Sequence, residues 1–381
     1  MMRRYPAYRE SGVDWLGEVP EGWGVKRLKD VCRVFPSNVD KHTVDGELPV
    51  SLCNYTDVYY REIISADIDF MQATATPDEI AKFSLLPGDV IFTKDSETAD
   101  DIGIAALVAE ELPGVVCGYH LSIARPGPLT SGGFIKRCFD SSFAKSYFAV
   151  SANGLTRVGL GQAATGNLPI PLPPLSEQTA IAAFLDREMG KIDALVAEQR
   201  RLIALLREKR QATISHAVTR GLNPAAPLKP SGVDWLGDVP EGWEVVRLKN
   251  DLLFLTSGSR GWAEHYSDDG ALFLRIGNLP REDFTLDLGD IQRVAVPTGA
   301  EGERTRVEAG DVLFSITAYL GSVAVVPDGL ETAYVSQHVA LARLKQRQML
   351  PEWVACVTLS IVGKNYLASQ GYGGVSETLC I

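Results

Sequence analysis

Three stretches of the sequence contain residue types that could support catalysis. The segment "NPAAP" from Asn223 only partly matches the Asn-Pro-Pro-aromatic motif with which an amino-methyltransferase holds a flipped base, and it lies in a linker. The Gly-rich segment "GLGQAATG" from Gly159 follows a predicted helix and loop, whereas a dinucleotide-binding loop follows a strand. The carboxylates of "PDEIAK" from Pro77 resemble part of a nuclease metal site, but a solvated turn that enters a helix explains them. We therefore predict a non-catalytic chain.

The six cysteines and five histidines do not have the spacing of a metal site. The sequence has no CxxC pair and no HxxxH or HExxH cluster, which argues against a zinc ribbon, a disulfide framework or a bound metal. Cysteines used in this way favour a reducing cytoplasm. The chain contains no run of about eighteen apolar residues, so we predict no membrane span. Its first residues lack the apolar core of a secretory signal.

The composition is that of a globular protein, with 45% hydrophobic and 22% charged residues. A chain of 381 residues is too long for one ordinary core, so two domains are expected. The net charge of −11 lowers the expectation of tight DNA binding by the chain alone. It does not exclude one basic face, or a subunit whose partners supply basic surface.

One long phrase occurs twice. "SGVDWLGEVPEGW" begins at Ser11 and "SGVDWLGDVPEGW" begins at Ser231. Further echoes follow at nearly constant offset, such as "LPGDVIFTK" with "EAGDVLFSI" and "CGYHLSIARP" with "YVSQHVALARL". The stretches between these anchors hardly match. The pattern indicates two related modules in which a common frame carries different inserts, as expected for two different specificities.

A long helix is predicted between the two modules. The Pro-punctuated segment "NLPIPLPPLSEQ" ends where Ser176 can cap a helix, and Gly221 and Pro224 end that helix. Its apolar positions recur about every 3.5 residues, which is typical of a coiled-coil seam. The helix would be a rod roughly 65 Å long that holds two modules apart. The predicted seam consists of Ile181, Leu185, Ile192, Leu195, Leu202 and Leu206.

The predicted fold class is mixed α/β, with two related domains that contain mixed or antiparallel sheets. Runs such as "DVIFTK", "DVLFSI" and "SVAVVP" favour strands. One amphipathic helix is expected to close each module, "FIKRCFDSSFAKSYFAVS" in the first and "PEWVACVTLSIVGKNYLAS" in the second. The predicted domains are residues 1–175, the spacer helix 176–221, and a second, C-terminally incomplete domain 222–381.

This arrangement resembles the specificity subunit of type I restriction–modification systems. The matching pieces are the duplicated "SGVDWLG.VPEGW", the two "GDV" strands, the "GYH…ARP" and "SQH…ARL" strands, and "LPIPLPPLSEQTAIAAFLD" before the long helix. The resemblance covers essentially the whole chain. It implies that each domain is a target-recognition domain that reads one half of a bipartite, asymmetric DNA sequence, and that the subunit has no catalytic site of its own.

The resemblance also implies partners and cofactors. Two methyltransferase subunits would dock on this chain and methylate adenine with S-adenosylmethionine, and a restriction (translocase) subunit would join them. This chain would bind no cofactor itself, since S-adenosylmethionine, ATP and Mg²⁺ are used by the partner subunits.

In one respect the sequence departs from the family pattern. After "QGYGGVSETLCI" no second Pro-rich segment and no second long helix follow, so the spacer helix lacks an antiparallel partner in the chain and its seam should be open. The chain could be a fragment, a naturally truncated subunit that is inactive, or a subunit that pairs its helix with that of a second copy. A homodimer would read a palindromic bipartite site.

The resemblance directs attention to side chains that could reach base edges or phosphates. The loops after "GDVIF" and "GDVLF" are the first candidates, because matched strands place unlike loops at corresponding positions. Arginines in Gly-rich loops or at a strand end are further candidates, and ordinary strand-end polarity is the alternative. His120 and His338 belong to the shared frame, so a structural role is favoured for both. The DNA-binding candidates are Thr93, Lys94, Ser96, Thr98, Tyr119, Arg157, Arg260, Arg275, Asn278, Ser315, Thr317, Tyr319 and Gln337.

Two other interpretations remain open. Trp15, Trp23, Trp235 and Trp243 could stack on bases, but their repetition favours a clip that packs the start of each module. A purely structural coiled-coil adaptor would explain the rod but not the divergent inserts. Sequence-selective dependence on DNA would separate such an adaptor from a specificity subunit.

Overall fold

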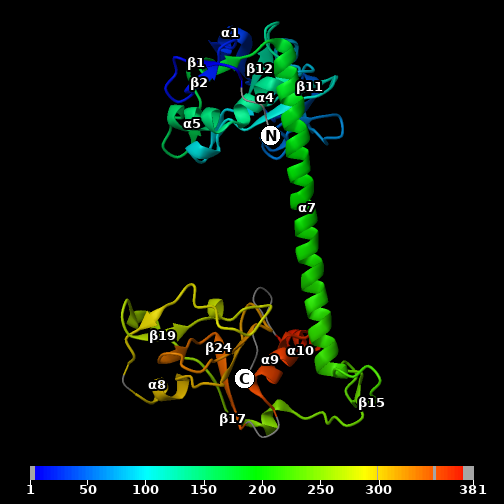
Figure 1. The fold of residues 1–381 in the computed structure, drawn as a ribbon, viewed down its shortest axis with the longest axis vertical. Coiled ribbons are helices and arrows are strands. Elements are labelled where there is room, and N and C mark those ends of the chain that lie inside the picture. The colour runs from blue at the N-terminus through cyan, green and yellow to red at the C-terminus, as the bar shows by residue number, and fades with distance from the viewer. Residues whose placement is uncertain (1–4, 298, 346–348, 372–381) are drawn as a thin grey trace. The chain divides into compact units, whose positions relative to one another are not determined.

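Figure 1 shows two units and one long helix that contributes to both. The computed structural model describes residues 5–297, 299–345 and 349–371. The units are Met1–Val196 and Ala197–Ile381, and their boundary lies within helix α7 (Leu175–Arg220). The predicted domain limits at 175 and 221 stay predictions. Residues 372–381, on which the predicted incompleteness of the second domain partly rests, lie outside the described residues.

The first unit contains two main sheets. The five-stranded sheet has the order β4-β12-β8-β10-β6, and only its β10–β6 pair is parallel. The three-stranded sheet has the order β11-β5-β7 and joins one parallel pair to one antiparallel pair. The strands are β1 (Tyr8–Glu10), β2 (Glu18–Pro20), β3 (Gly24–Arg27), β4 (Cys32–Pro36), β5 (Leu48–Cys53), β6 (Ile63–Ile64), β7 (Met71–Ala75), β8 (Val90–Thr93), β9 (Asp95–Ser96), β10 (Ala105–Val108), β11 (Val115–Cys117), β12 (Leu121–Pro126), β13 (Val158–Gly159) and β14 (Pro169–Leu172). The helices are α1 (Leu28–Val31), α2 (Tyr55–Tyr59), α3 (Pro77–Phe83), α4 (Gly132–Asp140), α5 (Ser142–Ser151) and α6 (Gln162–Gly166), with a 3-10 turn at Ala99–Asp101.

The five-stranded sheet buries apolar side chains on both of its faces. Successive side chains of a strand point to opposite sides of the sheet, so neighbouring residues belong to different cores. In β8, Ile91 belongs to the core shared with the three-stranded sheet. Its neighbours Val90 and Phe92 belong to a second core, under α4 and α5. A continuous "VIF" run is therefore what a central strand buried on both faces requires.

The second unit repeats this design. Its sheets have the orders β17-β24-β21-β22 and β18-β20-β19-β23, and the β19–β23 pair is parallel like β5–β11. In β21, Val312 and Leu313 again face different cores. The strands are β15 (Leu228–Pro230), β16 (Asp238–Pro240), β17 (Leu252–Ser257), β18 (Tyr266–Ser267), β19 (Ala271–Leu274), β20 (Arg293–Val294), β21 (Val312–Ser315), β22 (Val323–Val325), β23 (Ala333–Val335) and β24 (Val339–Leu344). The helices are α8 (Ala300–Thr305), α9 (Pro351–Leu359) and α10 (Ile361–Gln370), with 3-10 turns at Leu248–Asn250, Trp262–His265 and Ile276–Asn278. The predicted mixed α/β class with two related domains is confirmed.

Two helices lie where each single closing helix was predicted, α4 and α5 in the first module and α9 and α10 in the second, so that prediction was wrong in both. The break falls at Ser141 and at Ser360. The Ser141 hydroxyl donates to the Cys138 carbonyl, which ends α4, and accepts the Ala144 N–H, which starts α5. Ser360 does the same with Val357 and Gly363. A serine that satisfies both helix ends locally makes the turn inexpensive, and an apolar periodicity does not reveal it.

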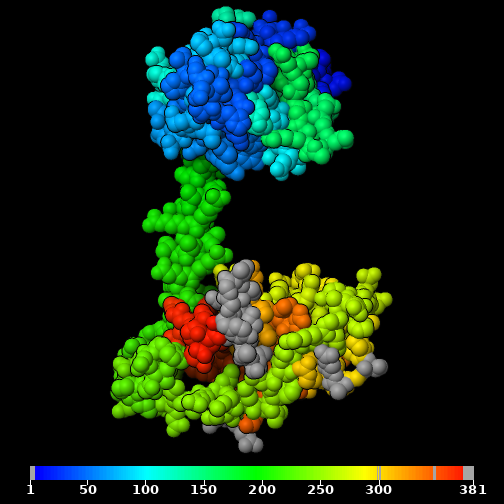
Figure 2. Space-filling view, turned by 180° about the vertical axis from the view of Figure 1, so that it is seen from behind, coloured from blue at the N-terminus to red at the C-terminus, as the bar shows by residue number. Residues whose placement is uncertain are grey.

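Helix α7 is a single helix of 46 residues. It begins at Leu175, one residue before the predicted cap, and Gly221 (φ +73°) ends it as predicted. Ile181 and Leu185 lie against the first unit. Every residue from Lys191 to Arg210 is exposed, and Figure 2 shows this stretch uncovered on the face it presents. Four predicted seam positions are 45–59% exposed: Ile192, Leu195, Leu202 and Leu206. The expectation of an open seam is confirmed for them.

Three cysteine thiols of the first unit lie in its interior. Cys32, Cys53 and Cys117 are buried and free, and Cys380 lies outside the described residues. Burial raises the pKa of the Cys32 thiol to about 12 and raises the pKa of the Cys53 and Cys117 thiols as well. Since the thiolate is the reactive form, a thiol reagent at pH 8 should leave these three unmodified in the native protein and modify them in denaturant. Mass spectrometry after timed labelling would check this.

No helix within the described residues is long and apolar enough to cross a bilayer.

Candidate nucleic-acid interface

The same buried ion pair holds the frame of both units together. In the first unit, Arg125 donates to the carboxylate of Asp89 through Nε (2.8 Å) and Nη2 (2.7 Å). In the second, Arg343 and Asp311 form the same fork at the same two distances. Each aspartate is only 1% exposed and also accepts a backbone N–H. The repeated "GDV" and "AR" sequences therefore supply the same aspartate–arginine ion pair in both units, called the clamp below. The residues at the strand ends take no part in the clamp and can differ between the units.

At the strand ends of the first unit, the Asp95 carboxylate contacts two side chains, those of His120 and Arg157. The His120 Nδ1 lies 2.8 Å from Asp95 Oδ2, and Arg157 Nη2 lies 2.7 Å from Asp95 Oδ1. The short antiparallel pairing of β9 with β13 brings Arg157 to this place, since Ser96 pairs with Val158. The carboxylate orients the guanidinium, whose side chain is half exposed. The structure thus brings together two residues that the sequence analysis treated separately.

Tyrosines surround this cluster. Tyr55 and Tyr59 stack with ring centroids 5.4 Å apart, and the Tyr119 ring lies against His120. The Tyr59 hydroxyl donates to Asp101 (2.8 Å), which raises the pKa of Tyr59 to about 12. Tyr60 is 76% exposed. These rings and hydroxyls can contact bases or phosphates. Tyr59 and Tyr60 were not among the predicted contact residues, although "YTDVYY" places Tyr55 and Tyr59 on one helix face.

The second unit has a histidine at the corresponding place with different partners. His338 Nδ1 lies 3.0 Å from Thr317 Oγ1, and the Gln337 amide nitrogen lies 3.1 Å from His338 Nε2. Tyr319 lies beside Arg281, with the guanidinium carbon 3.4 Å from its ring centroid. Between Thr317 and Tyr319, Ala318 adopts φ +61°, a conformation that costs free energy for a residue with a Cβ. A shared histidine therefore supports unlike surfaces in the two units.

Several predicted contact residues lie in the interior, which corrects their assignment. Thr93, Ser96 and Ser315 are buried, and the Thr93 hydroxyl accepts the Ile104 N–H. Asn278 is also buried: it caps the turn from Arg275 and donates to two carbonyls, those of Asp287 and Asp290. These side chains point into the interior or form hydrogen bonds with the backbone. We therefore do not retain the following four as contact residues: Thr93, Ser96, Asn278 and Ser315.

Lys94 is partly withdrawn from the surface. Its Nζ donates to the Ser37 carbonyl (2.8 Å), and burial lowers the pKa of the ammonium group. Arg275 pairs with Asp290 at 3.1 Å. The other predicted contacts reach the surface or its edge and stay predictions: Thr98, Tyr119, Arg157, Arg260, Thr317, Tyr319 and Gln337.

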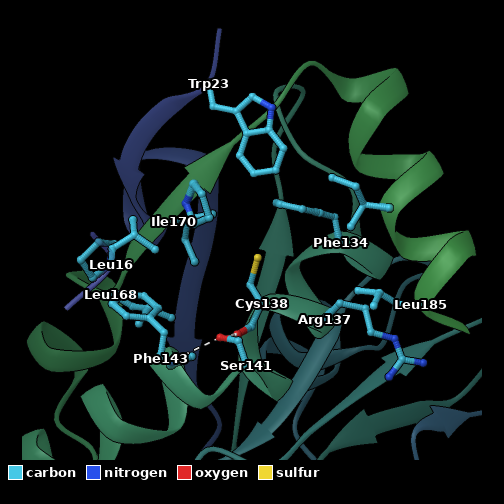
Figure 3. Close-up of a pocket in the computed structure, with 14 residues that line it drawn as sticks. Leu16, Trp23, Phe134, Arg137, Cys138, Ser141, Phe143, Leu168, Ile170 and Leu185 are labelled. Atoms are coloured by element: carbon cyan, nitrogen blue, oxygen red, sulfur yellow. Dashed lines mark hydrogen bonds between the residues drawn. The ribbon is translucent and has the colours of Figure 1, made fainter. Parts of the chain in front are cut away.

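The tryptophans pack as the clip interpretation predicts. Trp15 lies against Tyr147 (5.5 Å between centroids), and Trp235 lies against Tyr366 (5.1 Å) at the corresponding place. The Trp23 indole N–H donates to Glu177 in the first turn of α7. Figure 3 shows Trp23 above an apolar pocket of the first unit. The pocket has a volume of about 250 Å³ and is lined mainly by α4, α5, β14 and α7. Among the residues that the structure describes, no group of histidine, cysteine or carboxylate side chains could hold a metal ion.

Comparison with known proteins agrees with this geometry. Residues 20–201 match the family described as Type I restriction modification DNA specificity domain. The chain is 24% identical over 317 residues to a putative type I restriction enzyme MjaX specificity subunit of Methanocaldococcus jannaschii, which covers 82% of this chain and 70% of that protein. It is 25% identical over 325 residues to the EcoKI specificity subunit of Escherichia coli K12, with 81% and 64% covered. The chain thus spans less than two thirds of the second relative.

Solved structures share the fold. One comes from work on complex assembly and conformational transition of the type I R-M system. It has a TM-score of 0.62 at 21% identity and covers 89% of this chain and 79% of that one. The HsdS subunit of Thermoanaerobacter tengcongensis has a TM-score of 0.53 at 21% identity, with 95% and 85% covered. The duplicated frame, the helix between its copies and these relatives agree: residues 20–201 belong to the type I restriction–modification DNA specificity family, and the chain as a whole is similar to its specificity subunits.

Proposed function

We propose that this chain reads a bipartite, asymmetric DNA sequence, one half with each unit. The observation that carries the proposal is the repeated clamp with unlike surroundings. Asp89–Arg125 and Asp311–Arg343 have the same geometry, yet the neighbouring strand ends present Asp95 in one unit and Thr317 in the other. A frame kept constant beneath variable side chains is what two readers of different sequences require.

The exposed side chains have the chemistry of groove and phosphate contacts. In the first unit, Arg157 can donate two N–H groups to guanine, while Tyr119 and Tyr60 can reach phosphates or stack. In the second unit, Gln337 can pair bidentately with adenine, and Tyr319 with Arg281 offers a ring and a cation. Arg260, Arg275 and Thr98 are further candidates for backbone contact.

The chain would act as a non-catalytic member of a larger complex in the cytoplasm. Methyltransferase subunits and a restriction (translocase) subunit are the proposed partners, and S-adenosylmethionine, ATP and Mg²⁺ would be bound by them. The net charge of −11 supports this division of labour, because partners that add basic surface would supply much of the nonspecific attraction to DNA.

The test is to co-express the chain with the methyltransferase encoded beside it, in a host without other modification, and to map methylated adenines by single-molecule sequencing. Two unlike short blocks with a fixed gap would support the proposal. Assembly of the complex without any motif would reject it in favour of an inactive subunit or an adaptor without DNA selectivity.

A second candidate follows from the exposed seam of α7. Two copies could pair their helices through Ile192, Leu195, Leu202 and Leu206, each about half exposed. Such a homodimer would read a palindromic bipartite site. The same methylation map distinguishes the two candidates, since a palindromic motif together with a dimeric mass in analytical ultracentrifugation would favour the second.

Replacing Arg157 with alanine should relax one base pair in one half of the motif. The loss is expected to be about 1–3 kcal/mol if Arg157 reads a base, whereas a phosphate contact would weaken binding equally on all sequences. Binding to a panel of single-base variants of the target would measure this. The half read by the second unit is the internal control, and Tyr319→Ala should show the reverse pattern. An effect spread over both halves would contradict the assignment.

A further inference from the structure

The Asp95 carboxylate is not needed to hold the frame that the two units share. Asp95 and Thr317 follow their "GDV" sequences at the same distance. In the first unit His120 contacts Asp95 (2.8 Å), and in the second unit His338 contacts the Thr317 hydroxyl (3.0 Å). A neutral hydroxyl therefore serves the shared histidine in place of a carboxylate. The negative charge of Asp95 needs another explanation, since a carboxylate at a proposed DNA interface repels phosphates.

The second contact of Asp95 supplies that explanation. Arg157 Nη2 lies 2.7 Å from Asp95 Oδ1, and the Arg157 side chain is 51% exposed while that of Asp95 is 20% exposed. The neighbouring Lys94 ammonium is bound to the Ser37 carbonyl (2.8 Å). The less exposed carboxylate therefore holds a more exposed guanidinium, which keeps an accessible edge.

The backbone of the loop that carries Arg157 is also held in place. Asn153 and Gly159 exchange two hydrogen bonds, of 3.1 and 2.9 Å, which close the loop. Gly154, with φ +147°, packs so closely that a Cβ there would lie 2.0 Å from the Arg157 carbonyl oxygen. With the backbone fixed in this way, the Asp95 contact restricts the freedom that remains, which is that of the Arg157 side chain. A side chain restricted before binding loses less entropy when it binds.

Charge decides which DNA group a guanidinium held in this way prefers. Arg157 and Asp95 carry opposite charges 2.7 Å apart, so from a distance the pair acts as a dipole and not as a cation. A phosphate brought to Arg157 would also meet the Asp95 charge, and like charges repel. Guanine carries no net charge and accepts two N–H groups, at O6 and N7, in a geometry that a guanidinium matches. Contact with a base is therefore favoured over contact with a phosphate.

We propose that Asp95 is a positioning residue for specificity. It orients Arg157 to read a guanine in the half of the target that the first unit reads, and it prevents Arg157 from serving as a phosphate contact. The proposal rests on the proposed function and adds the base, the residue that reads it and the residue that positions the reader. Asp95 acts through Arg157 and does not itself need to touch DNA.

The test uses the chain assembled with its methyltransferase subunits and duplexes that carry the motif from the methylation map. Affinities are measured by competition for the motif, for its single-base variants and for a duplex without the motif, over a series of salt concentrations. Arg157→Ala should lower the discrimination at one G·C pair about tenfold. It should change the slope of log affinity against log salt concentration by much less than about 0.9, the value for one phosphate contact.

Asp95→Asn separates positioning from a structural role. Discrimination at the same pair should fall about tenfold. Binding to the duplex without the motif should stay equal or become tighter, because a negative charge is removed and Arg157 is free to reach phosphates. Combined with Arg157→Ala, it should lower discrimination no further than Arg157→Ala alone. Glu97→Gln is the matched control, since it removes the same charge from an exposed position two residues away and should leave discrimination unchanged.

Three results would overturn the proposal: a slope reduced by about 0.9 in Arg157→Ala with discrimination retained, unchanged discrimination in Asp95→Asn, or equal weakening of Asp95→Asn on all duplexes. Exchange of the Leu160 amide, which donates to the Lys94 carbonyl (2.8 Å), reports on the pairing of β9 with β13. Loss of its protection in Asp95→Asn would mark Asp95 as a structural residue and would also overturn the proposal. A complex that assembles but yields no methylation motif would instead reject the proposed function, and this inference with it.

Discussion

Replacing Asp89 with alanine is expected to lower the free energy of unfolding of the first unit by about 3 kcal/mol. The Asp89 carboxylate is 1% exposed, accepts two N–H groups from Arg125 and accepts the Leu86 N–H. The substitution removes the negative charge and leaves the Arg125 guanidinium, which is 24% exposed, without its main partner. An uncompensated, largely buried charge costs more than the pair itself contributes. Hydrogen exchange at increasing urea, followed peptide by peptide, would report each unit separately.

The second unit supplies the matched control. Asp311→Ala breaks the same fork, but Arg343 keeps the exposed carboxylate of Glu308 at 2.8 Å. We expect a smaller loss, about 2 kcal/mol, confined to the second unit. Each variant should leave exchange in the other unit unchanged, because the buried clamps belong to separate cores. Equal loss in both units from either variant would contradict this assignment.

Replacing Gln178 with leucine should release the start of α7 from the first unit. The Gln178 side chain is completely buried and makes four hydrogen bonds: its oxygen accepts from Thr130 and Ser131, and its amide donates to Leu129 and Pro173. Leucine has a similar size but leaves these groups without partners in a place that excludes water. The expected loss is about 3 kcal/mol in the free energy of unfolding of the first unit. Faster exchange in residues 175–186 would be its local sign.

The matched control uses the same helix. Gln199 lies in the exposed stretch, so Gln199→Leu makes the same chemical change without burying or orphaning a polar group. Urea denaturation of the first unit, followed by exchange of its β8 and β12 peptides, should be unaffected by this control. If Gln178→Leu proved as harmless as Gln199→Leu, the buried amide would not be what attaches α7.

At the strand ends, several predicted contact residues are buried. The repeated words located the shared frame, the long helix and its open seam, because these depend on composition and periodicity along the chain. The same reasoning selected Thr93 and Ser315 as contacts, and both are buried. Polarity at a strand end does not reveal which face a side chain takes. That depends on the neighbouring strand and on the local hydrogen bonds, such as the one from Ile104 to Thr93.

Asp95, Tyr59 and Tyr60 lie at the candidate interface but were not predicted there. None stood out, because a carboxylate does not suggest a DNA contact and a tyrosine run has many explanations. Only when β9 pairs with β13 does Asp95 meet both His120 and Arg157. Residues 95, 120 and 157 lie far apart in the sequence, and no local sequence pattern predicts a contact among them.

The sequence by itself determined the resemblance to the family, the duplication and the long helix, since each depends on short repeated sequences or on a regular period. The tertiary structure decided which polar side chains reach the surface and how Ser141 and Ser360 divide the closing helices. The physical reason is the range of the interactions. Propensity, capping and periodicity act within a few residues, whereas burial, ion pairing and strand pairing depend on segments that only folding brings together.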